Sequence, residues 1–156
     1  MKEKLITFAV PCYNSQDYMQ RCLKSLLTGG GQVEIIVIDD GSTDRTGEIA
    51  DHYEKEYPGI VKAVHQKNGG HGAGVNRGLS LAAGEYFKVV DSDDWLDETA
   101  LKRLPMDMQK RKRKGQMPDL IICNYLYDHL HEEKQKRMGY ENVFCEGQVC
   151  TWDTIG

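Results

Sequence analysis

Three aspartates lie within four residues of the chain, at Asp91, Asp93 and Asp94. Neighbouring carboxylates repel one another, which lowers stability unless a cation lies among them. Oxygen ligands suit the hard cations Mg²⁺ and Mn²⁺, which keep coordination positions open for phosphate oxygens, and a metal ion there would neutralise a diphosphate leaving group. The alternative is an acidic cap for a helix that begins near Asp97. The position directly after an apolar segment, residues 86–90, favours the metal.

A second pair of carboxylates, Asp39 and Asp40, follows the apolar segment 33–38. Gly41 and Ser42 come next and are typical of a turn and a helix cap. A simple turn therefore explains the end of this segment, but it does not explain two carboxylates at its start. A carboxylate at such a position can accept the imide proton of a uracil base or the hydroxyl protons of a ribose. We interpret the pair as part of a nucleotide site.

Two more polar segments follow apolar ones: Pro-Cys-Tyr-Asn at residues 11–14, and a glycine-rich segment at residues 68–74. The glycine segment does not match the dinucleotide fingerprint G-x-G-x-x-G, because Arg77 occupies the third glycine position and the segment follows the third strand instead of the first. The sequence also lacks the phosphate loop GxxxxGK[ST]. A glycine-rich approach to a diphosphate at a helix N-terminus fits the segment, and His71 could reach such a group, although a loop histidine is more often only solvated.

The elements that must position these groups alternate regularly along the chain. Apolar, β-branched segments predict strands at residues 5–10, 33–38, 60–64, 86–90 and 120–123. Amphipathic spacing predicts helices between them. The first helix should start at Ser15, and the second should be capped by Ser42 or Thr43. The third is a short helix over residues 75–83 with Leu79 on its inner face, and the fourth starts near Asp97 and is disturbed by Pro105.

This alternation predicts an α/β fold, with a mostly parallel open sheet and helices on both faces. Parallel strands bring their carboxyl ends to one edge, where open α/β sheets bind ligands, so the four polar segments should converge. Past Tyr125 the pattern weakens, with one more strand suggested at 143–149. We expect one domain in residues 1–125 and an incomplete region in residues 126–156, with the C-terminus truncated.

Composition sets limits on the class of protein. The 156 residues are 40% hydrophobic and 28% charged, which is typical of one globular domain. No apolar run reaches the length of a membrane helix and no signal peptide is recognisable, so the cytoplasm is the expected location. A formal net charge of −4 argues against a general nucleic-acid binder. The basic run 110–114 favours a solvated helix end. The alternatives are a patch that contacts the inner face of the membrane and a patch that binds nucleic acid.

The five cysteines are an odd number, and the sequence contains no CxxC pair. Cys12 and Cys22 lie inside apolar patterns and are predicted to be buried free thiols. A disulfide between Cys145 and Cys150 is not expected in the cytosol.

The ordered set of polar segments resembles the inverting glycosyltransferases of family 2, which have the GT-A nucleotide-sugar-binding fold. The resemblance covers residues 5–104 and includes the strand end Val-Pro-Cys-Tyr-Asn, the turn Asp-Asp-Gly-Ser-Thr-Asp, the Asn-Gly-Gly loop, and Asp-Ser-Asp-Asp after residues 87–90. It implies a transferase that moves a sugar from a UDP-type donor to a glycan or cell-envelope acceptor, with inversion and with Mn²⁺ or Mg²⁺ as cofactor. It also implies that residues 1–125 are a donor-binding domain and that residues 126–156 begin an acceptor-side region.

The resemblance also assigns roles to single residues. Pro11 and Tyr13 would line the nucleobase pocket, Asp40 would bind the uracil, and Asp39 and Asn68 would lie in or beside the pocket. Asp91 and Asp93 match the family's DxD motif, with Asp93 as the expected direct metal ligand and Asp94 as the next candidate. The remaining residues of these segments that we expect to contact the donor are Asn14, Asn76 and Ser92. The sequence departs from the family beside Asn76, where relatives carry an Arg-Asn pair and this chain has Val75.

The family's general base is a carboxylate that lies later in the chain than the DxD motif. Glu141, Glu146 and Asp153 are the late acidic candidates outside the charged stretch, and none of them has a convincing context. We therefore expect the base beyond residue 156. Two other functions stay open at this point, a nucleotide-sugar-binding module without a base and a nucleotidyltransferase. An uncovered sheet edge would also allow pairing with a second copy of the chain.

Overall fold

The computed structural model describes residues 3–128, 135–143 and 147–151 and divides the chain into two units, Met1–Lys114 and Gly115–Gly156. In chain order, the first unit consists of β1 (Ile6–Cys12), α1 (Met19–Leu27), the 3₁₀ helix η1 (Gly30–Gln32), β2 (Val33–Asp39), α2 (Thr46–Glu56), β3 (Val61–His65), α3 (His71–Leu81), β4 (Tyr86–Val89) and α4 (Glu98–Arg113). The second unit contains an antiparallel pair, β5 (Tyr125–Asp128) and β6 (Gln135–Met138). No helix among these described residues is long and apolar enough to cross a membrane.

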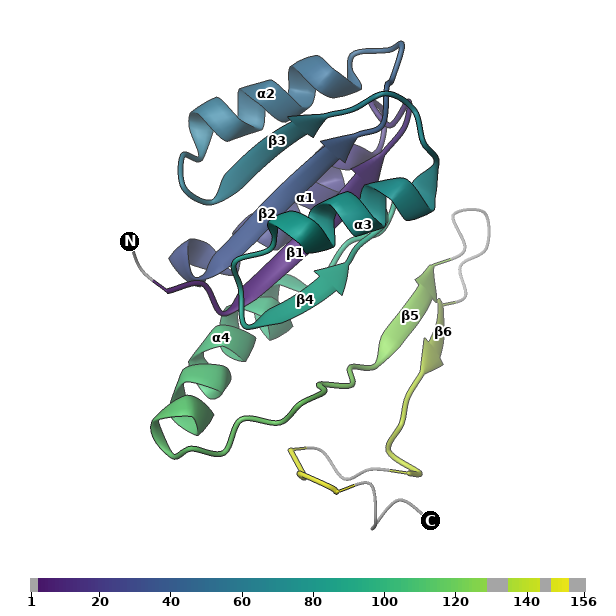
Figure 1. Cartoon of the computed structure of the whole chain (residues 1–156). Coiled ribbons are helices and arrows are strands. Elements are labelled where there is room, and N and C mark those ends of the chain that lie inside the picture. The colour runs from purple at the N-terminus through teal and green to yellow at the C-terminus, as the bar shows by residue number, and fades with distance from the viewer. Residues whose placement is uncertain (1–2, 129–134, 144–146, 152–156) are drawn as a thin grey trace. The chain divides into compact units, whose positions relative to one another are not determined.

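Four parallel strands form the sheet of the first unit, in the order β3-β2-β1-β4 (Figure 1). The connections from β1 to β2 and from β2 to β3 run in one direction, and the connection from β3 to β4 returns across the sheet. Because such crossovers are right-handed, α3 lies on the opposite face from α1. In Figure 1, α3 lies in front of the strands and α1 behind them. The predicted open parallel sheet with helices on both faces is confirmed.

The core is centred on β2, as its continuous apolar run predicts. Ile35, Ile36, Val37 and Ile38 are all fully buried, because helices cover both faces of the strand. The apolar stripe of α1 is buried from Met19 to Leu26, and both Cys12 and Cys22 are buried free thiols, as predicted. Burial raises the pKa of the Cys22 thiol to about 12, so that thiol is inert at neutral pH.

Pro11 was expected to end the first strand at Val10, but β1 continues to Cys12. β1 pairs with β4 only as far as Ala9, which lies opposite Val89. The missing N–H of Pro11 therefore falls beyond the last paired position on that side, where the sheet needs no donor.

Two helices begin at positions that differ from the prediction. α2 begins at Thr46 and not after a cap at Ser42 or Thr43, since those residues bond to the preceding β1–α1 loop. α3 begins at His71 and not at Val75, because Gly70 takes a left-handed conformation with φ 84° that turns the chain directly into the helix.

The inward face of α3 also differs from the prediction. Leu79 is 55% exposed, whereas Gly74 and Gly78 are buried. The helix approaches β1 so closely that a Cβ atom on Gly78 would lie 2.5 Å from the Cβ of Ala9, and one on Gly74 would lie 3.2 Å from the Cβ of Pro11. Glycines at a four-residue spacing therefore set the distance between helix and sheet.

Pro105 does not interrupt α4, which is continuous through it. Its ring is buried beside Leu101 and Met108 on the inner face of the helix, and this burial offsets the lost backbone hydrogen bond. Asp97 caps the helix as expected, accepting from the Ala100 amide at 2.7 Å.

The second unit differs most from the prediction. Residues 120–123 form no strand, and β5 begins instead at Tyr125. β6 falls in the polar and charged residues 128–139, where the weak pattern past Tyr125 predicted no regular element. Of the strand suggested at 143–149, the described residues 143 and 147–149 are not in a strand, and residues 144–146 lie outside the described residues. The functional boundary at residue 125 stays a prediction.

Replacing Gly78 with alanine should destabilise the protein even though alanine favours helices. The added Cβ has no room against Ala9, and we expect the free energy of unfolding to fall by about 1–3 kcal/mol. Gly72 is the matched control, because a Cβ at this position of the same helix meets nothing within 4 Å. Gly72→Ala should instead raise the free energy of unfolding by up to about 1 kcal/mol. Urea denaturation of both variants measures the contrast, and equal effects would contradict the close packing.

Candidate functional site

The ends of β1 and β2 are joined by hydrogen bonds between the loops that follow them. The backbone amide of Asn14 donates to Ser42 Oγ at 3.0 Å, and the side-chain oxygen Oδ1 of Asn14 accepts from the backbone amide of Thr43 at 2.9 Å. Asn14 has a φ of 50°, which asparagine tolerates better than most residues. One residue later, the Ser15 amide donates to Thr46 Oγ1 at 2.7 Å. The polar segment after β1 and the polar segment after β2 therefore form one connected surface.

Asp39 is held by two groups, one from the loop after β2 and one from β3. Its Oδ1 accepts from the Ser42 amide at 3.0 Å, and its Oδ2 lies 3.0 Å from Nδ1 of His65, at the end of β3. The other ring nitrogen of His65 lies 2.8 Å from Asp51 on α2. Burial acts to raise the pKa of Asp39, but the hydrogen bonds from Ser42 and His65 hold it below its ordinary value. The two carboxylates, Asp39 first, raise the pKa of His65.

Asp40 is almost completely buried, at 3% exposure, and it binds the glycine segment. Its carboxylate accepts from Gln66 Nε2 at 2.6 Å, from the Gly69 amide at 2.9 and 3.1 Å, and from the Gly70 amide at 2.7 Å. The bond from Gln66, followed by those from the two amides, lowers the pKa of Asp40 against the effect of burial. These donors engage both carboxylate oxygens.

The acidic segment after β4 is tied to two other strand ends. Nε2 of His71, the first residue of α3, lies 2.9 Å from Oδ1 of Asp91. Ser92 Oγ lies 2.8 Å from Ser15 Oγ, in the loop after β1. Asp91, Asp93 and Asp94 are all exposed. Burial of its carboxyl group and the charges of Asp93 and Asp91 raise the pKa of Asp94. The effect of the two charges is the repulsion between carboxylates that the sequence predicts.

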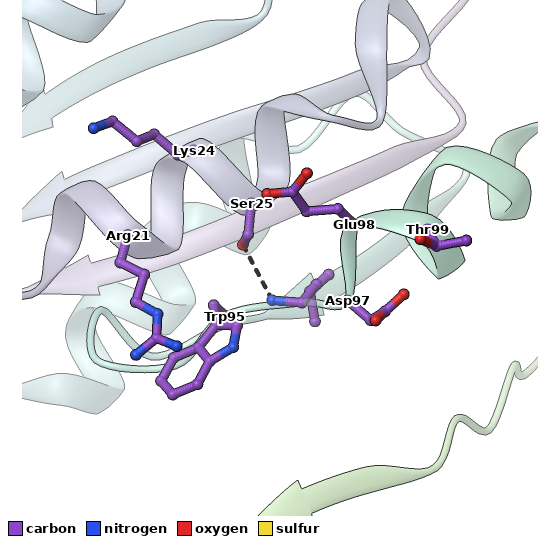
Figure 2. A pocket seen from close by; sticks show the side chains of 8 residues that line it. Arg21, Lys24, Ser25, Trp95, Asp97, Glu98 and Thr99 are labelled. Carbon is purple, nitrogen blue, oxygen red and sulfur yellow. Dashed lines mark hydrogen bonds between the residues drawn. The ribbon is translucent and has the colours of Figure 1, made fainter. Parts of the chain in front are cut away.

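The chain that follows the acidic segment is fixed to α1 around a surface pocket of about 590 Å³ (Figure 2). The guanidinium carbon of Arg21 lies 3.2 Å from the centre of the Trp95 ring, and Ser25 Oγ accepts from the Leu96 amide at 3.1 Å. Asp91, Asp93 and Asp94 do not line the pocket. Its lining residues instead hold the segment next to them in place.

The predicted donor-binding residues lie at or directly after the carboxyl ends of the strands, except Asn76, which lies within α3. They also differ in accessibility. Tyr13 is 54% exposed, and Asn68 and Asn76 are exposed as well. Pro11 is buried, with its ring against Gly74 of α3. Because it is buried, Pro11 is better placed to support the residues of the predicted nucleobase pocket than to contact a ligand itself.

Residues that connect the strand ends were missed by reasoning from the sequence alone. His65 and Gln66 lie at the end of β3, and neither belongs to a recognisable motif. Their position directly after an apolar segment was the available signal, the same signal that identified the other three strand ends.

The late carboxylates gain no support as a general base. Glu141 accepts a hydrogen bond from Asn124 and pairs with Arg137 within the second unit. Glu146 and Asp153 lie outside the described residues.

Comparison with known proteins identifies the family. The family described as Glycosyl transferase family 2 matches residues 7–151. Putative glycosyltransferase EpsH of Bacillus subtilis is 36% identical over 80% of this chain and 35% of its own length. Glycosyltransferase GlyG of Streptococcus pneumoniae is 39% identical over 78% of this chain and 39% of its own length. The chain thus spans little more than a third of these relatives, and it belongs to glycosyltransferase family 2.

Solved structures agree with this assignment. The crystal structure of Staphylococcus aureus TarS 1–349 in complex with UDP-GlcNAc is 32% identical and has a TM-score of 0.61, covering 69% of this chain and 32% of that one. A Pyrobaculum calidifontis mannosyltransferase in complex with GDP-Man and Mn²⁺ is 23% identical with a TM-score of 0.56, which supports the fold alone. The family membership favours a glycosyltransferase over the nucleotidyltransferase that the sequence left open.

Asp40→Asn should destabilise the protein in the absence of any ligand. The NH₂ group of the new asparagine would face the N–H groups of Gln66, Gly69 or Gly70, which need an acceptor. Leaving such buried N–H groups without an acceptor costs about 1–3 kcal/mol. Asp93→Asn is the matched control, since Asp93 is exposed, and it should leave the free energy of unfolding unchanged or slightly raised. Equal stability of the two variants would contradict the anchoring role of Asp40.

Removing His65 should change how stability depends on pH. The raised pKa of His65 means that its contribution is fully present below its unfolded pKa of 6.5 and is lost as pH rises through the folded value. The lowered pKa of Asp39 adds stability that is present above its unfolded pKa of 3.8 and is lost as the pH falls through the folded value. His65→Gln should therefore be less stable than the native chain at pH 5.5, by at most about 1 kcal/mol because the ring is half exposed. The deficit should shrink by pH 8.5.

Chemical denaturation at the two pH values measures this change. His52→Gln provides the control, since His52 is an exposed histidine of α2 that forms an ion pair with Glu56 on the same helix. A deficit for His65→Gln that is the same at both pH values would contradict the electrostatic origin of this contact.

Proposed function

We propose that this chain forms the donor-binding part of an inverting glycosyltransferase, which transfers a sugar from a UDP-type donor to a glycan of the cell envelope. One observation carries the proposal. Four strand ends are linked by hydrogen bonds into a single polar edge, in which His71 joins the glycine segment to Asp91 and Ser15 joins the first loop to Ser92. Such an edge suits a ligand that has a base, a ribose and a diphosphate.

The names of similar proteins support the donor and the acceptor class. TarS has been crystallised with UDP and with UDP-GlcNAc. The poly(ribitol-phosphate) β-glucosyltransferase of Bacillus spizizenii is 40% identical over 63% of this chain. The name of the TarS complex gives a UDP-sugar as the ligand, and the Bacillus spizizenii name gives poly(ribitol phosphate) as the acceptor. From the first we extend a UDP-sugar donor to this protein, and from the second we propose an acceptor polymer of the cell envelope.

Within the donor site, Tyr13 would contact the base, and Asp40 would accept the uracil imide proton. Asp40 already accepts from Gln66, Gly69 and Gly70, so contact with uracil requires one of these bonds to be exchanged. This exchange would couple recognition of the base to the position of the glycine segment. Asn68 and Asn76 are exposed beside that segment and can donate to ribose or phosphate oxygens.

The residues of the acidic segment fit a divalent cation of the Mg²⁺ or Mn²⁺ type. Among the residues that the structure describes, no three His, Cys, Asp or Glu side chains form a preassembled metal site. A cation shared with a diphosphate needs only one or two protein carboxylates, because phosphate oxygens and water supply the other ligands. Asp93 would be the first ligand, with Asp91 and Asp94 beside it. The cation, when bound, would neutralise charge on the diphosphate leaving group.

The protein's own residues would orient these carboxylates. His71 holds one oxygen of Asp91, and the Ser15–Ser92 contact fixes the backbone between Asp91 and Asp93. The cytoplasmic location and the pairing with a second copy stay predictions from the sequence.

UDP should bind with a clear requirement for Mn²⁺ or Mg²⁺, since the diphosphate otherwise faces three uncompensated carboxylates. Calorimetric titration of UDP with and without metal measures this requirement. Asp93→Ala should remove most of the metal dependence, whereas Asp107→Ala, which removes an exposed aspartate of α4, should leave it unchanged. Equal UDP affinity in the presence and absence of metal would contradict the assignment of the acidic segment.

Competition with GDP and ADP in the same titration tests the base-binding assignment, because a uracil-specific acceptor should reject both purines. Transfer assays with full-length protein and a UDP-sugar panel then separate an enzyme from a donor-binding module, which would bind UDP and transfer nothing.

A further inference from the structure

The exposed side of α4 is strongly basic, although the whole chain has a formal net charge of −4. The helix contains six cations and two carboxylates. Its inner side is apolar and buried at Leu101, Pro105 and Met108. The opposite side carries exposed residues at helical spacing, which we term the basic face of α4: Lys102, Arg103, Met106, Lys110 and Arg113. Thr99 and a carboxylate, Asp107, are also exposed on this helix, and its cations outnumber its carboxylates.

The charges of this face are not used to hold the fold together. Lys112, which lies off the face, is the cation that pairs with Glu3 and Glu85. Within the basic face, Lys102 makes a long contact of 3.7 Å to Glu98. No carboxylate of the described residues lies within ion-pair distance of Arg103, Lys110 or Arg113. These cations therefore project a positive field into solvent.

The centre of the face is apolar. Met106 is 68% exposed, and Arg103, Lys110 and Arg113 lie three, four and seven residues from it along the helix, which places them on the same side. A helix with a cationic side and an exposed apolar residue at its centre is suited to a lipid–water interface, where cations meet phosphates and the apolar group enters the acyl boundary. Nucleic acid would use the cations but gain little from Met106.

We propose that the basic face of α4 docks on the surface of an anionic lipid bilayer. The cations would lie against lipid phosphates, and Met106 would enter the interface. Because Asp97 caps α4 and follows the acidic segment Asp91–Asp94 closely in the chain, this contact would hold the proposed metal site near the membrane surface. The inference goes beyond the proposed transfer reaction and does not depend on which donor binds.

Vesicle co-sedimentation tests the proposal directly. The chain is mixed with vesicles of phosphatidylcholine containing about a third phosphatidylglycerol, and separately with vesicles of phosphatidylcholine alone. We expect binding to the anionic vesicles only, and we expect it to weaken strongly between low salt and about 0.5 M salt, because screening shortens the range of the field.

A triple variant isolates the basic face. Arg103→Gln, Lys110→Gln and Arg113→Gln together should lower the partition constant by about a hundredfold, on the basis of roughly fivefold for each cation near an anionic surface. The matched control replaces three exposed lysines elsewhere, Lys55, Lys62 and Lys136, with glutamine. It removes the same charge and should lower the partition constant by less than about tenfold. Met106→Gln should weaken binding by a few-fold.

Circular dichroism and UDP titration of each variant establish that it is folded and keeps its donor site. Loss of vesicle binding with UDP binding intact supports the docking surface. Equal loss in the two triple variants would overturn it, as would equal binding to neutral and anionic vesicles. Tighter binding to a labelled single-stranded oligonucleotide than to anionic vesicles, at the same salt concentration, would also overturn it in favour of nucleic acid.

Discussion

The carboxylate of Asp40 organises the edge of the sheet on which the rest of the site depends. It is buried, and it binds the two glycine amides just before α3. A buried carboxylate without partners would be strongly unfavourable, so these bonds and the one from Gln66 are required for Asp40 to remain ionised. In return, Asp40 determines where the chain leaves β3 and enters α3. The starting point of α3 then brings His71 to Asp91.

The same constraint explains the glycines of α3. A helix that starts so close to the strand ends must cross β1 at short distance, and Gly74 and Gly78 make that distance possible because they lack a Cβ. From the sequence, the glycine-rich segment 68–74 fits an approach to a diphosphate. Within the described structure, the role of Gly74 and Gly78 is to pack a helix against a sheet, and the two amides closest to the strand ends are bound by Asp40 instead.

The acidic segment shows how the fold tolerates a locally unfavourable arrangement. Asp91, Asp93 and Asp94 repel one another, and this repulsion contributes to the raised pKa of Asp94. Contacts on either side hold the segment in place: the Ser15–Ser92 bond, the Arg21–Trp95 contact and the Ser25–Leu96 bond. Sites that violate local rules while their surroundings remain well packed are typical of functional positions.

Much of the first unit could be predicted from the sequence, because it depends on local pattern. Apolar segments gave the four strands, their alternation with helices gave the parallel sheet, and the parallel sheet in turn required the four polar segments to meet at one edge. The character of each segment, acidic or glycine-rich, is likewise a property of its residues alone. Only the tertiary structure decided which polar groups bind one another, since Asp40 with Gly70, Asp39 with His65 and Ser15 with Ser92 are distant in the chain. The second unit was predicted least well, because its two short strands are exposed, and exposed strands lack the apolar pattern by which a buried strand can be recognised.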